Sequence, residues 1–345
     1  MIDLLSMTYE ELGAMLKEMG QPKFRAKQLY EWLNRGASWD EMRNLPTILR
    51  EQLAKNCTAN PIEIERSITS KIDGTQKFLF RLMDGNLVEG VLMRYHHGAT
   101  LCLSTQVGCK MGCAFCASTL DGCVRNLTPG EMLGQVVLIH RRLMESGSRI
   151  ANLVLMGSGE PLDNYDNVLK FIRLAIDERG LNLSTRGISL STCGLVPEMD
   201  RLSKEGLQLT LSLSLHASND KIRREIMPIA NVYTIQQTLD ACKRYIEKTG
   251  RRVILEYALI DSVNDDLAHA DELSRLLRGM QCHVNLIPLN EVAERNLRPP
   301  SPERVRAFLT RLEHRHISAT VRREMGSDIQ GACGQLRRHA MNQAQ

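Results

Sequence analysis

The chain has 345 residues, of which 43% are hydrophobic and 24% charged, and its formal net charge of +4 permits a nucleic-acid partner without requiring one. It contains no run of 18 apolar residues and begins without the basic and apolar stretches of a signal peptide, which excludes a membrane-spanning or secreted protein and predicts a soluble, cytoplasmic one. In such a protein, ten cysteines indicate metal ligands or redox thiols in place of structural disulfides.

Residues 1–60 are predicted to form a small helical accessory domain. Thr8 and Glu11 have the spacing of a capping box ahead of an apolar run, and a second helix is expected to bury one face over residues 24–33. Three basic residues and three aromatic ones cluster within residues 23–32. This pattern is typical of a surface that grips a phosphate backbone, and equally of a solvated helix face above an aromatic core.

Residues 61–99 are predicted to form a β meander that links the helical domain to the core. Apolar residues recur at every second position, and the dipeptides at 73–74 and 84–85 are both Asp-Gly. Asp-Gly favours tight turns between antiparallel strands. The meander is expected to lead into a strand over residues 100–105.

Strands and helices alternate regularly from residue 100 to 320, and the remaining residues, 321–345, are expected to form a C-terminal loop. The expected strands lie near 100–105, 152–156, 187–192, 208–215, 253–259 and 282–288. Six strand–helix units predict an α/β fold, a partial (β/α)6 TIM-like barrel. In such barrels the working residues follow the carboxyl ends of the strands.

Three cysteines follow the first of these strands with the spacing C-x3-C-x2-C: Cys109, Cys113 and Cys116. Three thiolates leave a four-metal cluster one ligand short, so one metal stays open for a substrate, whereas a structural metal is normally closed by four ligands. A zinc knuckle completed by a distant His or Cys, or three incidental thiols, are the alternatives. The embedded Gly112 and Phe115 favour a loop that wraps a cluster.

Four other strand ends carry short polar or acidic side chains. The candidate ligand-binding residues are Gly159 and Glu160 after the second strand, Ser191 in the third, Ser214, Leu215 and His216 in the fourth, and Asn290 after the sixth. A carboxylate can accept a hydrogen bond from an ammonium group, and the others suit the hydroxyls and base of a nucleoside. A single histidine is more often structural, but the convergence of four strand ends on one barrel mouth indicates a binding site.

The cysteine spacing resembles that of the radical S-adenosylmethionine (SAM) enzymes. A narrower resemblance comes from Cys102 and from Cys333, the latter in Gly-Ala-Cys-Gly-Gln-Leu, which look like the two working cysteines of the RlmN/Cfr family of rRNA adenine methyltransferases. The similarity extends over essentially the whole chain, including the segments Phe-Arg-Ala-Lys-Gln-Leu-Tyr, Gly-Glu-Pro and Ser-Leu-His-Ala. Ser158 departs from many members, in which Met often stands, and leaves the neighbouring Gly and Glu in place.

The resemblance implies that the three cysteines hold a [4Fe-4S] cluster that binds SAM, and that two SAM molecules are used per turnover, one as methyl donor and one as radical source. The expected reaction is methylation of carbon 2 of an adenosine in the peptidyl-transferase region of 23S rRNA, and in some members also of the adenosine 3′ of the anticodon in tRNA. Cys333 would carry the methyl group and become covalently joined to the RNA. Cys102 would release the product by forming a transient disulfide with Cys333, and Glu89 would accept the ring proton. The strand pattern alone predicts that Glu89 is an outward-facing residue on an amphipathic strand.

The implied partners are 23S rRNA, tRNA in some members, and an electron donor such as flavodoxin or ferredoxin, with no membrane and a monomeric chain. Basic pairs such as Arg223-Arg224 and Arg322-Arg323 are interpreted first as solvated surface pairs, although they could contact phosphates. Two alternatives stay open. One is methylation at carbon 8 of adenine in 23S rRNA, the Cfr-type resistance activity, and the other is a non-catalytic, zinc-stabilised RNA-binding assembly factor.

Overall fold

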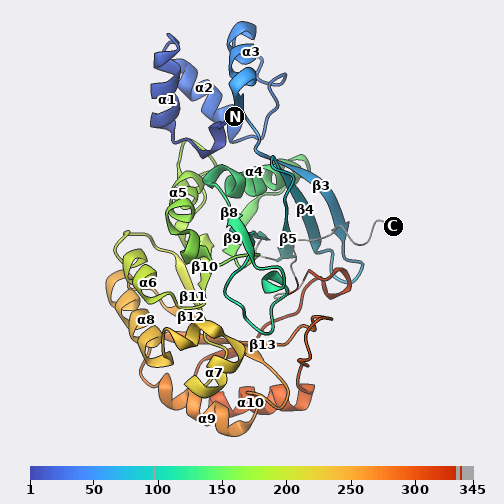
Figure 1. Cartoon of the computed structure of the whole chain (residues 1–345), viewed down its shortest axis with the longest axis vertical. Helices are drawn as coiled ribbons and strands as arrows, with labels where there is room; N and C mark the ends of the chain where they lie inside the picture. Colours follow the sequence, from blue (N-terminus) through green and yellow to red (C-terminus); the bar gives the residue numbers. More distant parts are fainter. Residues whose placement is uncertain (97, 332–334, 336–345) are drawn as a thin grey trace.

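The computed structural model describes residues 1–96, 98–331 and 335. A small helical unit at the N-terminus stands on a larger α/β body, as Figure 1 shows. This unit contains helices α1 (Tyr9–Glu18), α2 (Phe24–Leu33) and α3 (Thr47–Asn56) and a parallel pair of two-residue strands, β1 (Ile2–Asp3) and β2 (Cys57–Thr58). The expected capping box is present, because the Thr8 side chain accepts from the Glu11 backbone while the Glu11 carboxylate accepts from the Thr8 N–H.

One ten-stranded sheet forms the centre of the body, in the order β14-β13-β12-β11-β10-β9-β6-β5-β4-β3. Its antiparallel part is the expected meander: β3 (Ile62–Thr69), β4 (Gln76–Leu82), β5 (Leu87–Tyr95) and β6 (Gly98–Cys102). Both Asp-Gly dipeptides lie in the turns, where Gly74 and Gly85 have φ angles of 73° and 83°. Glycine adopts this left-handed backbone without steric cost, so the sequence signal and the structure agree.

The parallel part begins with β6 and curves into an open barrel. Its strands are β9 (Ile150–Leu155), β10 (Ile188–Thr192), β11 (Thr210–Ser214), β12 (Val253–Leu259), β13 (Cys282–Pro288) and β14 (Ala319–Val321). The helices are α4 (Pro129–Glu145), α5 (Tyr165–Ile176), α6 (Val196–Leu202), α7 (Asp220–Ile226), α8 (Ile235–Thr249), α9 (Leu267–Leu276) and α10 (Pro302–His314). The six predicted strands and the barrel fold are confirmed. The short β14 and α7 were not predicted, nor was the hairpin of β7 (Gln106–Gly108) and β8 (Cys123–Asn126).

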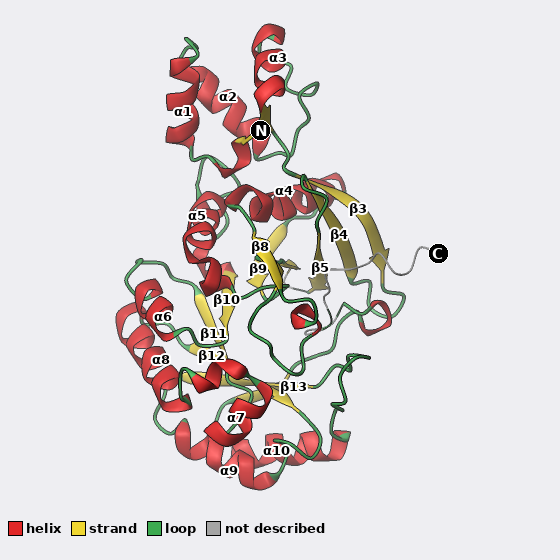
Figure 2. Cartoon of the chain, in the orientation of Figure 1, coloured by secondary structure: helices red, strands yellow, loops and turns green. Residues whose placement is uncertain are grey.

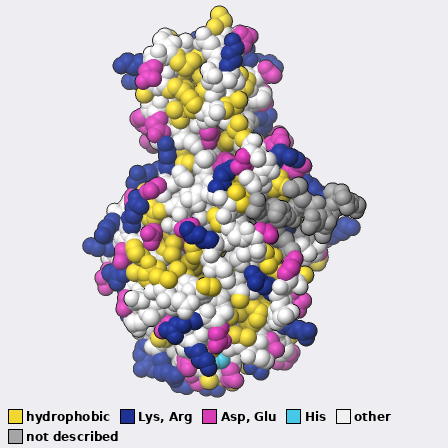
Figure 3. Space-filling view, in the orientation of Figure 1, with side chains coloured by type: hydrophobic (Ala, Val, Ile, Leu, Met, Phe, Trp, Pro, Cys, Tyr) yellow, Lys and Arg dark blue, Asp and Glu magenta, His cyan; other side chains and the backbone are white. Residues whose placement is uncertain are grey.

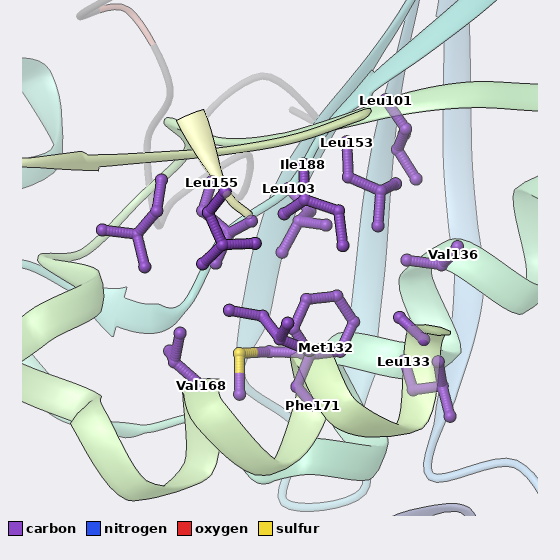
Figure 4. Packing of buried hydrophobic residues seen from close by; sticks show 14 of the residues in the cluster. Leu101, Leu103, Met132, Leu133, Val136, Leu153, Leu155, Val168, Phe171 and Ile188 are labelled. Carbon is purple, nitrogen blue, oxygen red and sulfur yellow. The ribbon is translucent and has the colours of Figure 1, made fainter. Parts of the chain in front are cut away.

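Helices cover the outer face of the curved sheet, and loops fill the opposite side, as the secondary-structure colouring in Figure 2 shows. The helix-facing side chains form the main core. Figure 4 shows Leu101, Leu153 and Ile188 from neighbouring strands packed over Met132 of α4 and Phe171 of α5. Each fully buried side chain of this size contributes roughly 1.5–3 kcal/mol. This core holds the strands in register, so the loops that follow their carboxyl ends start from fixed positions.

The charged side chains at the surface are mixed in sign. On the face in Figure 3, basic and acidic side chains are interspersed, so this view shows no extended field of a single sign. Within the described ranges, no helix is both long enough and apolar enough to cross a bilayer.

Candidate functional site

Two adjoining cavities open at the carboxyl ends of the barrel strands. The cysteine cavity is lined by residues that include Cys109, Cys113, Cys116, Gly159, Glu160, Ser191, Cys193, Ser214, His216, Glu256 and Asn290. The meander cavity lies beside it, between the meander and the segment that follows β14, and is lined by residues that include Val91, Met93, Cys102, Met325, Gly331 and Gln335. The two cavities share Met156, Ile287, Leu289, Asn290 and Arg322. A group bound in one cavity is therefore next to a group bound in the other.

The loop that carries the three cysteines is held at its base by the β7–β8 hairpin. Gly108 has a φ of 80°, and a Cβ at this position would lie 2.0 Å from the carbonyl oxygen of Gly122. The Cys109 N–H donates to that same oxygen at 2.9 Å. Only glycine allows so close an approach of the two strands, so Gly108 fixes where the loop begins.

The outer part of the loop is held by a hydrogen bond to the last residue of α7 and by a hydroxyl group within the loop region. The Ala114 N–H donates to the carbonyl of Ile226 at 2.9 Å, and the Thr119 hydroxyl lies 2.9 Å from the Cys116 carbonyl. Phe115 packs edge-on against the ring of His216, with 4.8 Å between the ring centroids. These contacts hold the loop through its backbone and through the ring of Phe115.

The three thiols line one wall of the cysteine cavity. Burial raises the pKa of the Cys109 thiol to about 12 and raises that of Cys113 as well, so without a metal these groups stay protonated at neutral pH. Metal binding would release those protons. Three thiols that line one cavity suit a cluster of several metal ions in which one metal has no protein ligand.

Glu160 lies across this cavity and is held on both carboxylate oxygens. Oε1 accepts from the Leu162 N–H at 3.1 Å and Oε2 accepts from the Cys193 N–H at 2.8 Å, and burial raises the pKa of this carboxyl. A Cβ on Gly159 would lie 2.7 Å from that of Gln106. Gly159 also lines the cysteine cavity, so its contact with a ligand stays a prediction.

His216 points into the cysteine cavity as a neutral ring. Its Nδ1 accepts from the Ala258 N–H at 2.9 Å, so the ring proton must sit on Nε2, which can donate to a ligand. Burial, together with the nearby Arg223 guanidinium, lowers the pKa of His216 to about 3. A backbone φ of 55° turns the chain here, immediately after β11.

The other predicted binding residues divide into two groups. Ser191 and Ser214 lie on neighbouring strands with their hydroxyl oxygens 3.3 Å apart, and both line the cysteine cavity, as does Asn290. Leu215 does not line either cavity: its side chain is fully buried, and its backbone N–H donates to the Glu256 carbonyl at 3.1 Å. Any contact from Leu215 to a ligand would have to come from its backbone.

Arg223 is the residue of the site that the sequence interpretation missed. It was interpreted as half of a solvated pair, but its side chain is completely buried. Its guanidinium donates to the carbonyls of Cys193 at 2.7 Å, Leu215 at 3.1 Å and Ser214 at 3.2 Å, so it joins the loops that follow β10 and β11. The only sequence signal was Asn219, which caps α7 and makes a helix at this position predictable.

The meander cavity places Cys102 opposite Val91 on β5, in an apolar cluster with Met93 and Met325. Glu89 lies two residues before Val91, on the same side of β5. It is buried, with 5% of its surface exposed, and its carboxylate pairs with the Lys77 ammonium at 2.7 Å. The outward orientation that the strand pattern alone suggested is therefore wrong. Glu89 does not itself line the cavity.

Cys333 lies outside the described residues, but the segment that leads to it is anchored to the meander. The Gly326 N–H donates to Asp73 Oδ2 at 2.9 Å, the Lys71 N–H donates to Asp328 at 3.0 Å, and the Lys77 ammonium contacts the Gln330 carbonyl at 3.3 Å. Although burial opposes it, backbone hydrogen bonds from Gly326 and Thr75 lower the pKa of Asp73 to about 2. These contacts bring residues 326–331 beside Cys102.

Comparison with known proteins covers almost the whole chain. Residues 103–273 match the radical SAM superfamily, and residues 2–59 match the ribosomal RNA large subunit methyltransferase N-terminal domain. A probable dual-specificity RNA methyltransferase RlmN of Alkaliphilus oremlandii is 53% identical over 343 residues, 99% of each chain. The corresponding protein of Lachnoclostridium phytofermentans is 54% identical and covers 98% of this chain and 94% of its own. A crystal structure of a radical SAM methyltransferase from Sphaerobacter thermophilus has a TM-score of 0.96 and 46% identity, covering 98% of this chain and 100% of that chain.

Proposed function

The chain belongs to the RlmN family of radical SAM RNA methyltransferases, and we propose that it transfers a methyl group to carbon 2 of an adenosine in 23S rRNA. This carbon has no lone pair and no acidic proton, so it cannot attack the methyl group of SAM by ordinary displacement. A radical route is therefore required. The target base must also be unstacked to reach the barrel mouth.

The cofactors are those of the radical SAM superfamily, a [4Fe-4S] cluster and SAM. When bound, the reduced cluster would supply the electron that cleaves SAM to methionine and a 5′-deoxyadenosyl radical. Cys109, Cys113 and Cys116 would hold the cluster. Glu160 and the hydroxyls of Ser191 and Ser214 face these cysteines across the same cavity, where they can orient SAM against the open metal.

Three residues outside the cysteine cavity carry the methyl transfer in this proposal. Cys333 takes the methyl group as a thioether and joins it to the ring carbon. Glu89 accepts the ring proton, and to reach the base its carboxylate must leave the Lys77 ammonium. Cys102 would then attack the Cys333 sulfur, so that the S–S bond forms as the S–C bond breaks, the released carbon takes a proton from solvent, and the one unpaired electron returns to the oxidised cluster. An external reductant then opens the disulfide. The transient disulfide and these three roles are part of the proposal.

The observation that carries the proposal is the adjacency of the two cavities. One is lined by Cys109, Cys113 and Cys116, and the other by Cys102 and by Gly331, at the end of the anchored segment that leads to Cys333. A radical generated in the first cavity would need to travel only across their shared wall. A structural zinc protein would have no use for this arrangement.

Partners and organisation are proposed on the same basis. Residues 1–60 would contact the RNA, residues 61–99 would connect to the core, residues 100–320 would form the catalytic barrel, and residues 321–345 would carry Cys333. The words "dual-specificity RNA methyltransferase" in the relatives' name support two RNA substrates, which in this proposal are 23S rRNA and tRNA, the latter at the adenosine 3′ of the anticodon. A flavodoxin or ferredoxin would supply the electron, and the chain would act as a cytoplasmic monomer.

The test uses reconstituted enzyme, an rRNA fragment and SAM with a fully deuterated methyl group. Transfer through S-methyl-Cys333 removes one deuterium from the methyl group before it joins the base, so the product should be 2-methyladenosine with two deuterium atoms. A product with three would show direct displacement and would overturn the route through Cys333. Formation of 8-methyladenosine would keep the route and move the activity to the alternative ring position.

A further inference from the structure

Glu256, on β12, is a buried carboxylate in the wall of the cysteine cavity that the function described so far does not use. Only 3% of its surface is exposed. Its Oε1 accepts from the Asn285 amide at 3.2 Å, whereas Oε2 is buried and has no hydrogen-bond partner. The nearest cation is the Arg322 guanidinium, whose Nη1 lies 3.9 Å from Oε2, too far for a hydrogen bond.

An unsatisfied carboxylate oxygen of this kind is costly, because burial removes its hydration and nothing replaces it. Native proteins satisfy nearly all such atoms, and those that remain point to a missing ligand, water or ion. A hydrogen-bond network from β13 and β14 also holds the Glu256 side chain in place. The Asn285 amide oxygen accepts from the Thr320 hydroxyl at 3.2 Å, and the His283 ring contacts that hydroxyl at 2.9 Å. The network therefore fixes Oε1 and leaves Oε2 without a hydrogen bond, on a residue that lines the cavity.

The neighbours of Glu256 indicate the kind of ligand. Ser214 is paired with Glu256 in the register of β11 and β12, and the hydroxyls of Ser214 and Ser191 are 3.3 Å apart. Three neighbouring strands thus present two hydroxyls and one carboxylate oxygen in a row. Such a row matches two adjacent hydroxyl groups, each able to donate and to accept. An anionic group would be repelled by Glu256, and Glu160 already provides an acceptor for an ammonium group across the cavity.

We propose that Glu256 Oε2 accepts a hydrogen bond from the ribose diol of SAM, with Ser191 and Ser214 beside it. Glu256 thereby becomes a recognition residue that distinguishes the ribose of the cofactor from a deoxyribose. The proposal rests on SAM as the ligand of this cavity and not on the base that is methylated. Arg322, which lines both cavities, keeps its contact with the same carboxylate.

The experiment measures equilibrium binding of SAM and of its 2′-deoxy and 3′-deoxy analogues to holoenzyme with an oxidised cluster, in which SAM is not cleaved. Wild-type enzyme should bind at least one of the deoxy analogues about tenfold or more weakly, since hydrogen bonds to charged groups are worth that much. Glu256→Leu should bind SAM about tenfold or more weakly and should no longer discriminate between SAM and that analogue. Glu256→Gln, which keeps the shape and one acceptor oxygen, should lie between them.

Glu205→Gln is the matched control, because this glutamate accepts from the Tyr165 hydroxyl and pairs with Arg173 outside both cavities. It should bind all ligands as the wild type does. Iron and sulfide content would show that each variant is loaded, and Glu256→Gln keeps the test informative if the leucine variant fails to fold. Unchanged SAM affinity in Glu256→Gln and Glu256→Leu, or an equal loss for SAM and both analogues, would overturn the proposal. No RNA is present, so a wrong assignment of the methylated base would leave this result unaffected.

Discussion

The cysteine cavity and the meander cavity adjoin each other but are built in different ways. The first is enclosed by the ends of consecutive parallel strands, and its polar groups are fixed by hydrogen bonds such as those on Glu160 and His216. The second is assembled from β5 and β6 and from a segment more than 200 residues later, which is held by contacts such as Gly326 to Asp73. The first is therefore set by the barrel itself, and the second depends on the docking of one terminal segment.

The two cavities therefore suit different steps of the reaction. A rigid cavity suits the binding of SAM and the generation of a radical, because the geometry of the reacting groups is fixed before the ligand arrives. A cavity closed by a terminal segment suits a step in which a thiol must move between SAM, the RNA base and a second thiol. Loss of a cluster cysteine from the first cavity should abolish every activity, whereas changes in the second should separate radical generation from product release.

The largest effect is expected from Cys113→Ser in the cysteine cavity. Loss of one of the three thiolates should reduce iron and sulfide to near background, and both SAM cleavage and RNA methylation should fall below detection. Wild-type protein reconstituted without oxygen should contain about four irons and four sulfides per chain and be brown. Full cluster content in the variant would show that these cysteines do not hold the cluster.

Cys102→Ala should separate the two cavities. The cluster and SAM cleavage should persist, but without the resolving thiol the RNA should stay covalently attached to Cys333 and turnover should stop. The adduct would be detected as a nuclease-sensitive shift of the protein on a denaturing gel. Cys333→Ala serves as the control and should give no adduct. Methylation by Cys333→Ala would contradict the two-cysteine route.

Arg223→Met should test the rigidity of the cysteine cavity. Removing the guanidinium leaves the carbonyls of Cys193, Ser214 and Leu215 without a buried donor, so the free energy of unfolding should fall by about 3 kcal/mol. SAM affinity should fall as well, because those carbonyls belong to the loops that line the cavity. The neighbouring Arg224 is exposed, so Arg224→Met is a matched control that should change neither quantity.

Asp73→Ala should loosen the segment that closes the meander cavity. It removes the acceptor for the Gly326 N–H, at a cost of about 1 kcal/mol. Methylation should fall several-fold while cluster content and SAM cleavage stay at the wild-type level. Glu247→Ala, on the exposed side of α8, provides the comparison and should leave all three unchanged. A parallel fall in SAM cleavage would show that the two cavities are not independent.

Asp84→Asn should have the smallest effect and a characteristic pH dependence. A hydrogen bond from Arg125, opposed by partial burial, lowers the pKa of Asp84 to about 2. Because this value is below that of the unfolded chain, the contact stabilises the fold above about pH 4 and is lost as the pH falls toward 2. The pair is partly exposed, so the effect at neutral pH should be under about 1 kcal/mol. Unfolding midpoints of wild type and variant should converge as the pH is lowered from 5 toward 2.

The sequence predicted the parts of the molecule that local patterns encode. Strand periodicity and the Asp-Gly turns each depend on residues close together in the chain, and the structure agrees with them. Arg223 was misread because its burial results from α7 folding back onto two loops, which no charge pattern reveals. The orientation of Glu89 was likewise set by its pairing with Lys77 on the neighbouring strand. The side chain of Leu215, just after β11, is fully buried, so its predicted contact with a ligand stays a prediction that only its backbone could fulfil.

The most direct test of the proposed activity is nucleoside mass spectrometry on rRNA and tRNA from cells with and without this protein, with authentic 2-methyladenosine and 8-methyladenosine as standards. The account predicts that 2-methyladenosine appears in 23S rRNA only when the protein is present, and that it also appears in tRNA if both substrates are used. Appearance of 8-methyladenosine in its place would contradict the assigned carbon. The absence of any methylated adenosine that depends on the protein would contradict the proposed activity altogether.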